Sequence, residues 1–380
     1  MLAVVLLSAA TAVAFYLLIG YPILLAVSRR SAPPVRKDPS FRPTFSILIA
    51  VHNGEEFLGR KLESLLALDY PPQLREILVV SDGSTDGTNA IAESFAPCGV
   101  RLLRVPRGGK AAALNAGLAQ ATGDLLFFTD VRQTLDPHAL SHLAANFADP
   151  SVGAVTGELR LLDSAAAGEQ ADMELYWRFE LWARSRHSRI DSIFSATGCI
   201  YALRRSLASP LPPDTIADDG AFSLRAFFRG YRVIFDPDAL AFDYPVAEGG
   251  EFRRRLRTLA GLWQLFVRLP QLFTRADRMR FHFLSYKFGR LVLPWAILVI
   301  WGSTFALPDS GWRNFLLVDE LALVALAVLD RFVPRAFPLK RISSPARTFL
   351  AMNAAALLAV LVFFVPPETL WRPTRVEARQ

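Results

Sequence analysis

The sequence predicts an α/β domain with a mostly parallel sheet, joined to helices that cross a membrane or lie on it. Between residues 45 and 130, apolar segments of strand length alternate with segments of helical periodicity. This order is typical of parallel sheets with right-handed crossovers. Hydrophobic residues make up 52% of the 380 residues, and charged residues make up 20%. We therefore expect one soluble domain of roughly 200–250 residues together with membrane segments.

The N-terminal segment from Leu2 to Val27 has no charged residue and is long enough to span a bilayer, which needs about 20 residues. A cleaved signal peptide is the alternative, but it would have a basic start and a shorter apolar core. We favour an uncleaved anchor over residues 1–28. The arginines that follow it, Arg29 and Arg30, predict that this side faces the cytoplasm.

The soluble domain is expected over residues 44–250, after a proline-rich linker over residues 29–43. Its first half alternates strands and helices, beginning with a strand at 45–50 and a helix at 55–68. The second half is less regular, with helices expected at 172–189 and 218–229. The remaining expected strands or extended segments are 76–80, 100–105, 125–129, 153–162, 197–203, 231–235 and 239–244.

The composition changes at Glu251, where arginines alternate with apolar residues. A basic amphipathic pattern predicts interface helices over residues 251–290. Three transmembrane helices are expected within residues 291–367, at 291–307, 315–333 and 349–365, before a tail at 368–380. Acidic residues interrupt the middle segment and are costly in a membrane, so they should lie near an end or face protein. The three are Asp319, Glu320 and Asp330.

The charge pattern favours membrane lipids as partners over nucleic acid. The net charge is +7, and the arginines crowd the edges of apolar segments instead of alternating with stacking aromatic residues on a soluble surface. Four spans would place the soluble domain in the cytoplasm and both termini outside, as in an integral protein of a bacterial inner membrane. The arginines of the tail, Arg372, Arg375 and Arg379, mildly oppose this placement. The two cysteines, Cys98 and Cys199, exclude a disulfide framework.

Charged residues follow the predicted strands in positions that suit diphosphate chemistry. Asp82 and Asp130 each follow a strand, and the carboxyl ends of parallel strands meet at one edge of a sheet. Lys110 follows two glycines at a predicted helix start. A lysine and a carboxylate at one crevice suit a diphosphate with a divalent cation. Asp219 could act as a general base, although an aspartate before a helix is more often a cap.

Six motifs occur in a characteristic order along this domain. They are SILIAVHN at 46–53, VVSDGSTD at 79–86, GKAAALNAG at 109–117, FTDVR at 128–132, DDGAFSLR at 218–225 and GYRV at 230–233. Together they resemble the motifs of family 2 glycosyltransferases, which have the GT-A fold. The resemblance covers about residues 44 to 265.

The resemblance implies an inverting transfer from a nucleotide-sugar, with a UDP-sugar favoured and Asp219 as the base. It implies Mg²⁺ or Mn²⁺ held at Asp130. The implied donor-binding residues are Ala50, His52, Asn53, Glu55, Asp82, Gly83, Lys110, Asp130 and Arg257. The implied acceptor-site candidates are Gly198, Cys199, Asp218 and Arg254.

Two departures from the family pattern leave alternatives open. Arg132 stands where the family has the second aspartate of its Asp-x-Asp motif. The Gln-x-x-Arg-Trp motif of processive synthases is missing its Gln and Trp in the corresponding stretch at 254–258. We therefore favour addition of one sugar to a lipid-linked or membrane-associated acceptor in glycan assembly, with glycan-assembly proteins as further partners. A processive polysaccharide synthase and a non-catalytic partner of glycan export are the alternatives.

Overall fold

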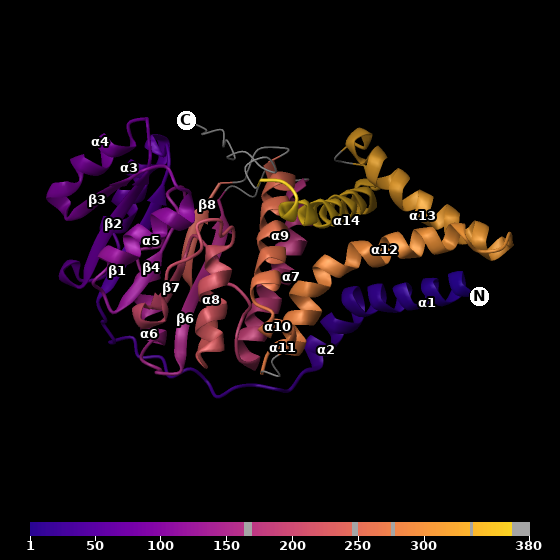
Figure 1. Cartoon of the computed structure of the whole chain (residues 1–380), viewed down its shortest axis with the longest axis horizontal. Helices are drawn as coiled ribbons and strands as arrows, with labels where there is room; N and C mark the ends of the chain where they lie inside the picture. Colours follow the sequence, from indigo (N-terminus) through magenta and orange to yellow (C-terminus); the bar gives the residue numbers. More distant parts are fainter. Residues whose placement is uncertain (163–168, 245–249, 275–277, 335–336, 367–380) are drawn as a thin grey trace. The chain divides into compact units, whose positions relative to one another are not determined.

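The computed structural model describes residues 1–162, 169–244, 250–274, 278–334 and 337–366 (Figure 1). The chain forms two compact units. The sheet unit comprises residues 30–163 and 184–245, and the helical unit comprises residues 1–29, 164–183 and 246–380. The predicted tail with its three arginines lies outside the described residues.

The sheet unit contains one eight-stranded sheet in the order β3-β2-β1-β4-β7-β6-β8-β5. The strands are β1 (Phe45–Val51), β2 (Arg75–Asp82), β3 (Val100–Val105), β4 (Leu125–Phe128), β5 (Thr134–Leu135), β6 (Val152–Leu161), β7 (Tyr201–Arg204) and β8 (Arg232–Asp243). The first four strands in this order are parallel. β7 is antiparallel to both of its neighbours, and β6 and β8 are again parallel. The α/β class and the mostly parallel arrangement are as the sequence predicts.

Helices follow the first three parallel strands along the chain in the predicted order, whereas the helix after β5 has no counterpart in the prediction. They are α3 (Glu55–Leu66), α4 (Thr88–Ser94), α5 (Lys110–Gln120), α6 (Ala139–Asn146) and α8 (Asp218–Phe228), and α7 (Glu169–Ile190) begins in the helical unit. Two expectations differ in detail. The extended segments at 231–235 and 239–244 form the single strand β8, which stays paired to β6 across two irregularities in register. Of the strand expected at 197–203, only the end is β7.

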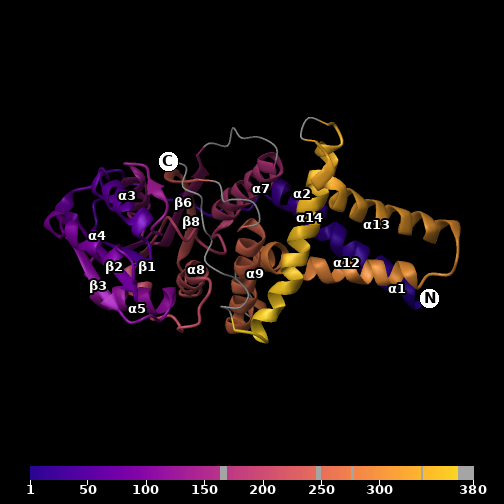
Figure 2. The same cartoon turned by 90° about the horizontal axis from the view of Figure 1, so that it is seen from above.

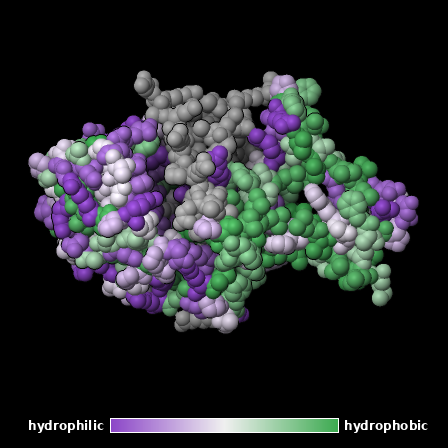
Figure 3. All heavy atoms as spheres, turned by 45° about the horizontal axis from the view of Figure 1, so that its top comes forward, coloured by the Kyte–Doolittle hydropathy of each residue, from purple (hydrophilic) through white to green (hydrophobic). Residues whose placement is uncertain are grey.

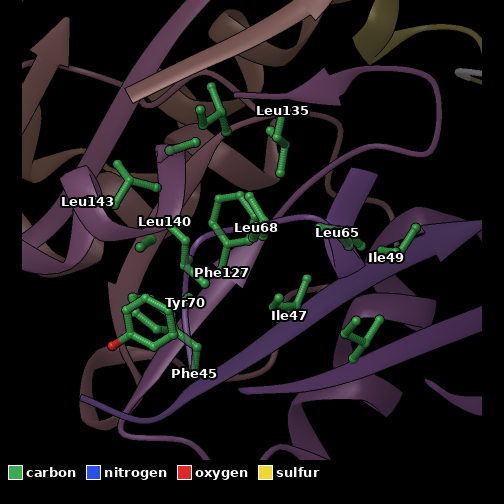
Figure 4. Packing of buried hydrophobic residues seen from close by; sticks show 14 of the residues in the cluster. Phe45, Ile47, Ile49, Leu65, Leu68, Tyr70, Phe127, Leu135, Leu140 and Leu143 are labelled. Carbon is green, nitrogen blue, oxygen red and sulfur yellow. The ribbon is translucent and has the colours of Figure 1, made fainter. Parts of the chain in front are cut away.

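The two faces of β1 pack against different helices. Phe45, Ile47 and Ile49 alternate along the strand toward the core cluster that includes Leu65 of α3 and Leu140 of α6 (Figure 4). On the other face, Leu48 packs close to α5, because a Cβ added at Gly117 would lie 2.9 Å from its Cδ2 atom. A parallel sheet covered on both faces needs apolar residues throughout its strands. This explains the apolar runs at 47–51 in β1 and at 125–128 in β4.

Among the described residues, the helical unit contains three helices that are long and apolar enough to span a membrane. They run over Leu2–Val27, Arg280–Phe305 and Lys340–Phe363. The first joins α1 (Leu2–Phe15) to α2 (Tyr21–Val27), the second joins α11 (Arg280–Phe283) to α12 (Gly289–Phe305), and the third begins with α14 (Lys340–Leu358). The unit also holds α9 (Gly250–Arg268), α10 (Gln271–Thr274) and α13 (Gly311–Leu329). α13 covers much of the segment expected at 315–333, but Asp319 and Glu320 interrupt its apolar sequence.

The helical unit exposes a large apolar surface in the space-filling view (Figure 3). Two views show α1 beside α12, whereas α14 runs across α12 and α13 (Figure 2). Two of the three acidic residues of this region, Glu320 and Asp330, face protein, as expected of costly intramembrane charges, whereas Asp319 is exposed in the middle of α13. Asp330 is fully buried and forms ion pairs with Lys340 and Arg347, each at 2.9 Å. Glu320 accepts a hydrogen bond from the Thr304 hydroxyl at 2.8 Å.

One glycine of the sheet unit is required by a close backbone approach. A Cβ at Gly123 would lie 2.6 Å from the backbone carbon of Phe45 and from the backbone nitrogen of Ser46. We expect Gly123→Ala to destabilise the fold by about 1–3 kcal/mol through overpacking, and hence to lower Tm measured on purified protein. Gly59 within α3 is the matched control, since a Cβ there meets nothing within 4 Å. Gly59→Ala should stabilise by about 0.5–1 kcal/mol. Equal Tm values for the two variants would contradict this account.

Candidate active site

The candidate site lies at the carboxyl edge of the parallel strands. β1, β2 and β4 run in the same direction, with Val51 paired to Ser81 and Leu48 paired to Phe128. The segments that leave these strands therefore meet at one edge. They contain most of the donor-binding residues that the sequence suggests.

Lys110 is the centre of the charged cluster. Its Nζ atom lies 3.0 Å from Asp130 Oδ1 and 3.2 Å from Asp218 Oδ1. Residues from α5, from α8 and from the segment that follows β4 thus converge, although Lys110 and Asp218 are 108 positions apart in the sequence. Burial disfavours the ammonium, but the carboxylates of Asp130 and Asp218 outweigh this effect and raise the pKa of Lys110. The lysine is therefore charged throughout the physiological range.

Asp219 adjoins the same cluster at the first turn of α8. Burial raises the pKa of its carboxyl to about 6, and the neighbouring charge of Asp218 adds to the effect. Lys110 and the backbone N–H of Gly220, which donates to Asp219 Oδ1 at 2.7 Å, act in the opposite direction. A carboxylate with a pKa moderately below neutral is ionised at pH 7 and still basic enough to accept a proton.

Gly198 lies beside this charged cluster, whereas the next residue, Cys199, is buried. A Cβ at Gly198 would lie 3.5 Å from Asp219 Oδ2 and 4.0 Å from Lys110 Nζ. The missing side chain therefore leaves room beside the carboxylate. Cys199 is buried, and its carbonyl accepts a hydrogen bond from the Thr129 hydroxyl at 2.8 Å.

Asp82 is buried beneath the loop that leads into Lys110. Its Oδ1 atom accepts the backbone N–H of Gly108 at 2.7 Å, and its Oδ2 atom accepts that of Gly109 at 3.0 Å. Arg107 forms an ion pair with the same carboxylate. Gly109 has a φ of 85°, which a residue with a side chain rarely adopts. Asp82 thus fixes the position of the loop, a role that its place after a strand did not reveal.

The loops after β1 and β2 are cross-linked by hydrogen bonds. Asn53 Oδ1 accepts the backbone N–H of Thr85 at 2.8 Å, and Glu55 Oε2 accepts that of Gly87 at 2.6 Å. Asn53 has a φ of 50°, which is a left-handed backbone conformation that residues other than glycine seldom adopt. These two residues hold the edge of the site in shape.

The remaining predicted donor-edge residues lie close by in the same loops. Ala50 is the partly exposed residue next to the end of β1, and Gly83 follows β2 with a φ of 61°. His52 is exposed, and a hydrogen bond of 2.8 Å joins its Nδ1 atom to the Asp82 carbonyl. Arg254 and Arg257 belong to α9 of the helical unit, and their predicted roles stay predictions.

Arg132 is engaged with protein at the position of the family's second aspartate. Its guanidinium forms an ion pair with Asp243, whose side chain is 1% exposed. The same Asp243 oxygen accepts a hydrogen bond from Gln133 Nε2 at 2.8 Å. Among the described residues, no group of three or more His, Cys, Asp or Glu side chains could hold a metal ion by itself. Asp130 still fits a divalent cation, because Mg²⁺ is often held by one or two carboxylates together with substrate phosphates and water.

Three contributors to the site have no motif in the sequence. Tyr201 stacks on Phe128, with ring centroids 4.7 Å apart, and its hydroxyl donates to Asp218 Oδ2 at 3.3 Å. Asp243 and the buried Lys61 bind residues of the segment at 129–133, which carries Asp130 and is named the Asp130 segment. Their role depends on strands and helices that are distant in sequence. The only local signal is a lysine on the apolar side of the α3 pattern.

Comparison with known proteins identifies the class. The family described as glycosyl transferase family 2 matches residues 46–210, and glycosyl transferase family group 2 matches residues 130–365. The second match covers more than half of the chain, so the chain belongs to the family 2 glycosyltransferases. It is therefore an enzyme, and the non-catalytic alternative is not supported.

Individual relatives agree with this assignment. The chain is 27% identical to a probable glycosyltransferase, YdaM, of Bacillus subtilis over 67% of this chain and 63% of the relative. It is 27% identical to the poly-β-1,6-N-acetyl-D-glucosamine synthase of Staphylococcus aureus over 72% and 67% of the two chains. The match to YdaM thus spans less than two thirds of that protein.

A solved structure confirms the fold. The mannosyltransferase PcManGT from Pyrobaculum calidifontis, determined with GDP-Man and Mn²⁺, superposes with a TM-score of 0.76 at 24% identity. The similarity covers 98% of this chain and 99% of that chain. The GT-A fold expected from the motifs is confirmed, and with three candidate spans the protein is membrane-associated.

The role of Asp82 as a loop anchor predicts a change in protease sensitivity. Asp82→Asn removes a charged acceptor worth about 1.5–3 kcal/mol to its partners. The fraction of molecules in which this loop is detached should then rise by at least about tenfold. The rate of limited trypsin cleavage after Arg107 should rise by the same factor. Glu76→Gln is the matched control, because Glu76 lies at the opposite end of β2 and accepts hydrogen bonds from Ser46 and Thr122. A wild-type cleavage rate in Asp82→Asn would refute the anchor role.

Proposed function

We propose that this glycosyltransferase moves one sugar from a nucleotide-sugar to a lipid-linked or membrane-associated acceptor, with inversion at the anomeric carbon. A UDP-sugar is the favoured donor, and the catalytic domain is proposed to face the cytoplasm. The convergence of Lys110, Asp130 and Asp219 beside Gly198 is the observation that supports this proposal most strongly.

Asp219 is proposed to accept the proton of the acceptor hydroxyl. The acceptor oxygen then forms a bond to the anomeric carbon as the bond from that carbon to the diphosphate oxygen breaks. The electron pair leaves with the nucleoside diphosphate, and the proton stays on Asp219. General base catalysis of this kind contributes about 10²–10⁴-fold.

Lys110 is proposed to stabilise the charge that develops on the leaving diphosphate. Its ammonium is fixed by Asp130 and Asp218 before substrate binds, so little reorganisation is needed during the reaction. Asp130 would hold Mg²⁺ or Mn²⁺, which adds further positive charge at the diphosphate. The pairing of Arg132 with Asp243 leaves Asp130 as the proposed carboxylate ligand from this motif.

A processive polysaccharide synthase is the second candidate. The similarity to a poly-β-1,6-N-acetyl-D-glucosamine synthase favours it. The absence of Gln and Trp from the stretch at 254–258 favours single addition. Product length separates the two, since one added sugar supports the first candidate and a ladder of products supports the second.

Nucleoside diphosphate release from purified protein in native membranes, screened over nucleotide-sugars with Mg²⁺ or Mn²⁺, tests the proposal. Asp219→Asn should lower transfer by at least about 10²–10⁴-fold, because the amide cannot accept the proton. Nucleotide binding should remain near the wild-type level. Asp238→Asn removes an exposed carboxylate of the same unit and should behave as wild type. Retained turnover in Asp219→Asn would reject its role as the base.

The pH dependence of transfer provides an independent check. Asp219 must be ionised to act as the base, and its pKa is raised to about 6. The value of kcat/KM should therefore fall as pH decreases through about 6. Asp218→Asn removes a negative charge that raises the pKa of Asp219, so this limb of the profile should move to lower pH. A limb that stays in place, or moves to higher pH, would contradict the assignment.

A further inference from the structure

A buried lysine lies on the inner side of the segment that carries Asp130. Lys61 of α3 is 1% exposed, and its neighbours Leu58 and Leu62 belong to the apolar core. Burial lowers the pKa of its amine to about 7. Placing an ionisable group in the core is costly, and a methionine of similar length would fill the same space without that cost. The residue therefore calls for an explanation beyond packing.

The amine of Lys61 bridges the two ends of the Asp130 segment. Its Nζ atom donates to Thr129 Oγ1 at 2.5 Å and to the Gln133 carbonyl at 2.8 Å. The Thr129 hydroxyl uses its own hydrogen to donate to the Cys199 carbonyl at 2.8 Å, so it acts as an acceptor toward Lys61. The two acceptors lie immediately before Asp130 and three residues after it. A single amine thus links the side chain just before this carboxylate to the backbone three residues after it.

Further contacts hold the same segment in place. Ser64, about one turn beyond Lys61 on α3, accepts the backbone N–H of Leu135 at 2.9 Å. From the opposite direction, Asp243 binds Arg132 and Gln133. The Asp130 side chain is 40% exposed and points to the charged cluster around Lys110. Buried polar contacts thus hold a segment whose carboxylate lies at the site.

We propose that Lys61 is a positioning residue that holds the Asp130 segment in the geometry needed to bind a divalent cation with a nucleoside diphosphate. This inference rests on the proposed function of Asp130. Lys61 acts through Thr129 and the Gln133 carbonyl and does not itself touch the substrate. Residues that orient metal ligands in this indirect way typically alter metal affinity or activity by about 10–100-fold when they are replaced.

Titration of UDP binding against Mn²⁺ with the purified full-length protein tests the inference. In Lys61→Met, the Mn²⁺ concentration for half-maximal UDP binding should rise by about 10–100-fold. Tm should change little, because the cost of burying the amine is removed while the Thr129 hydroxyl and the Gln133 carbonyl lose a donor. Leu58→Met is the matched control, since it changes a buried residue on the same helix and should leave the Mn²⁺ titration unchanged.

Thr129→Val removes the same hydrogen bond by changing its acceptor. It therefore tests the inference even if Lys61→Met does not fold. It keeps the side-chain shape but removes the hydroxyl, and it should weaken Mn²⁺-dependent UDP binding in the same direction. Because both substitutions remove the hydrogen bond between Lys61 and Thr129, the loss in the double variant should be smaller than the sum of the two single losses. Additive losses would overturn that mechanism.

Two outcomes separate this inference from the proposed function. Wild-type Mn²⁺ dependence in Lys61→Met and Thr129→Val would overturn the positioning role and leave the proposed function standing. UDP binding by the wild-type protein that does not respond to Mn²⁺ or Mg²⁺ would overturn the metal role of Asp130 and the inference with it.

Discussion

The candidate site depends on one cation shared among three carboxylates. Asp130, Asp218 and Asp219 come from two parts of the chain, and like charges this close disfavour each other's ionisation. Lys110 lies within 3.2 Å of two of them and lowers the pKa of the third. That ammonium offsets the mutual repulsion of the carboxylates. The proposed metal ligand and the proposed base thus lie side by side around one cation.

The loop that precedes Lys110 sets the position of this cation. Lys110 starts α5, so its position follows from the loop at 107–109, and Asp82 binds that loop through two backbone N–H groups. The Asp130 segment is held in a comparable way by Lys61 and Asp243. Each support is a buried polar group with partners on a neighbouring segment, an arrangement that fixes one geometry because any other leaves the group unsatisfied.

The helical unit applies the same rule to charges among apolar helices. Glu180 of α7 is buried and is bound by Tyr286 at 2.6 Å, Lys287 at 2.9 Å and Arg290 at 2.6 Å. Asp330 is paired with Lys340 and Arg347. An unpaired charge in either place would be costly. These pairs therefore tie together helices whose apolar contacts alone give little directional preference.

The sequence by itself determined the class of fold, the order of strands and helices, and the identity of the charged residues at the carboxyl edge. These features are local: apolar runs specify buried strands, glycines specify the turns before Lys110, and motif order specifies the family. The tertiary structure alone decided which residues meet. It turned Asp82 inward to the loop, paired Arg132 with Asp243, and placed Lys61 beneath Asp130. Such contacts join residues that are 25 to 111 positions apart, and no local pattern encodes them, because a carboxylate after a strand can face a ligand or its own loop with equal backbone propensity.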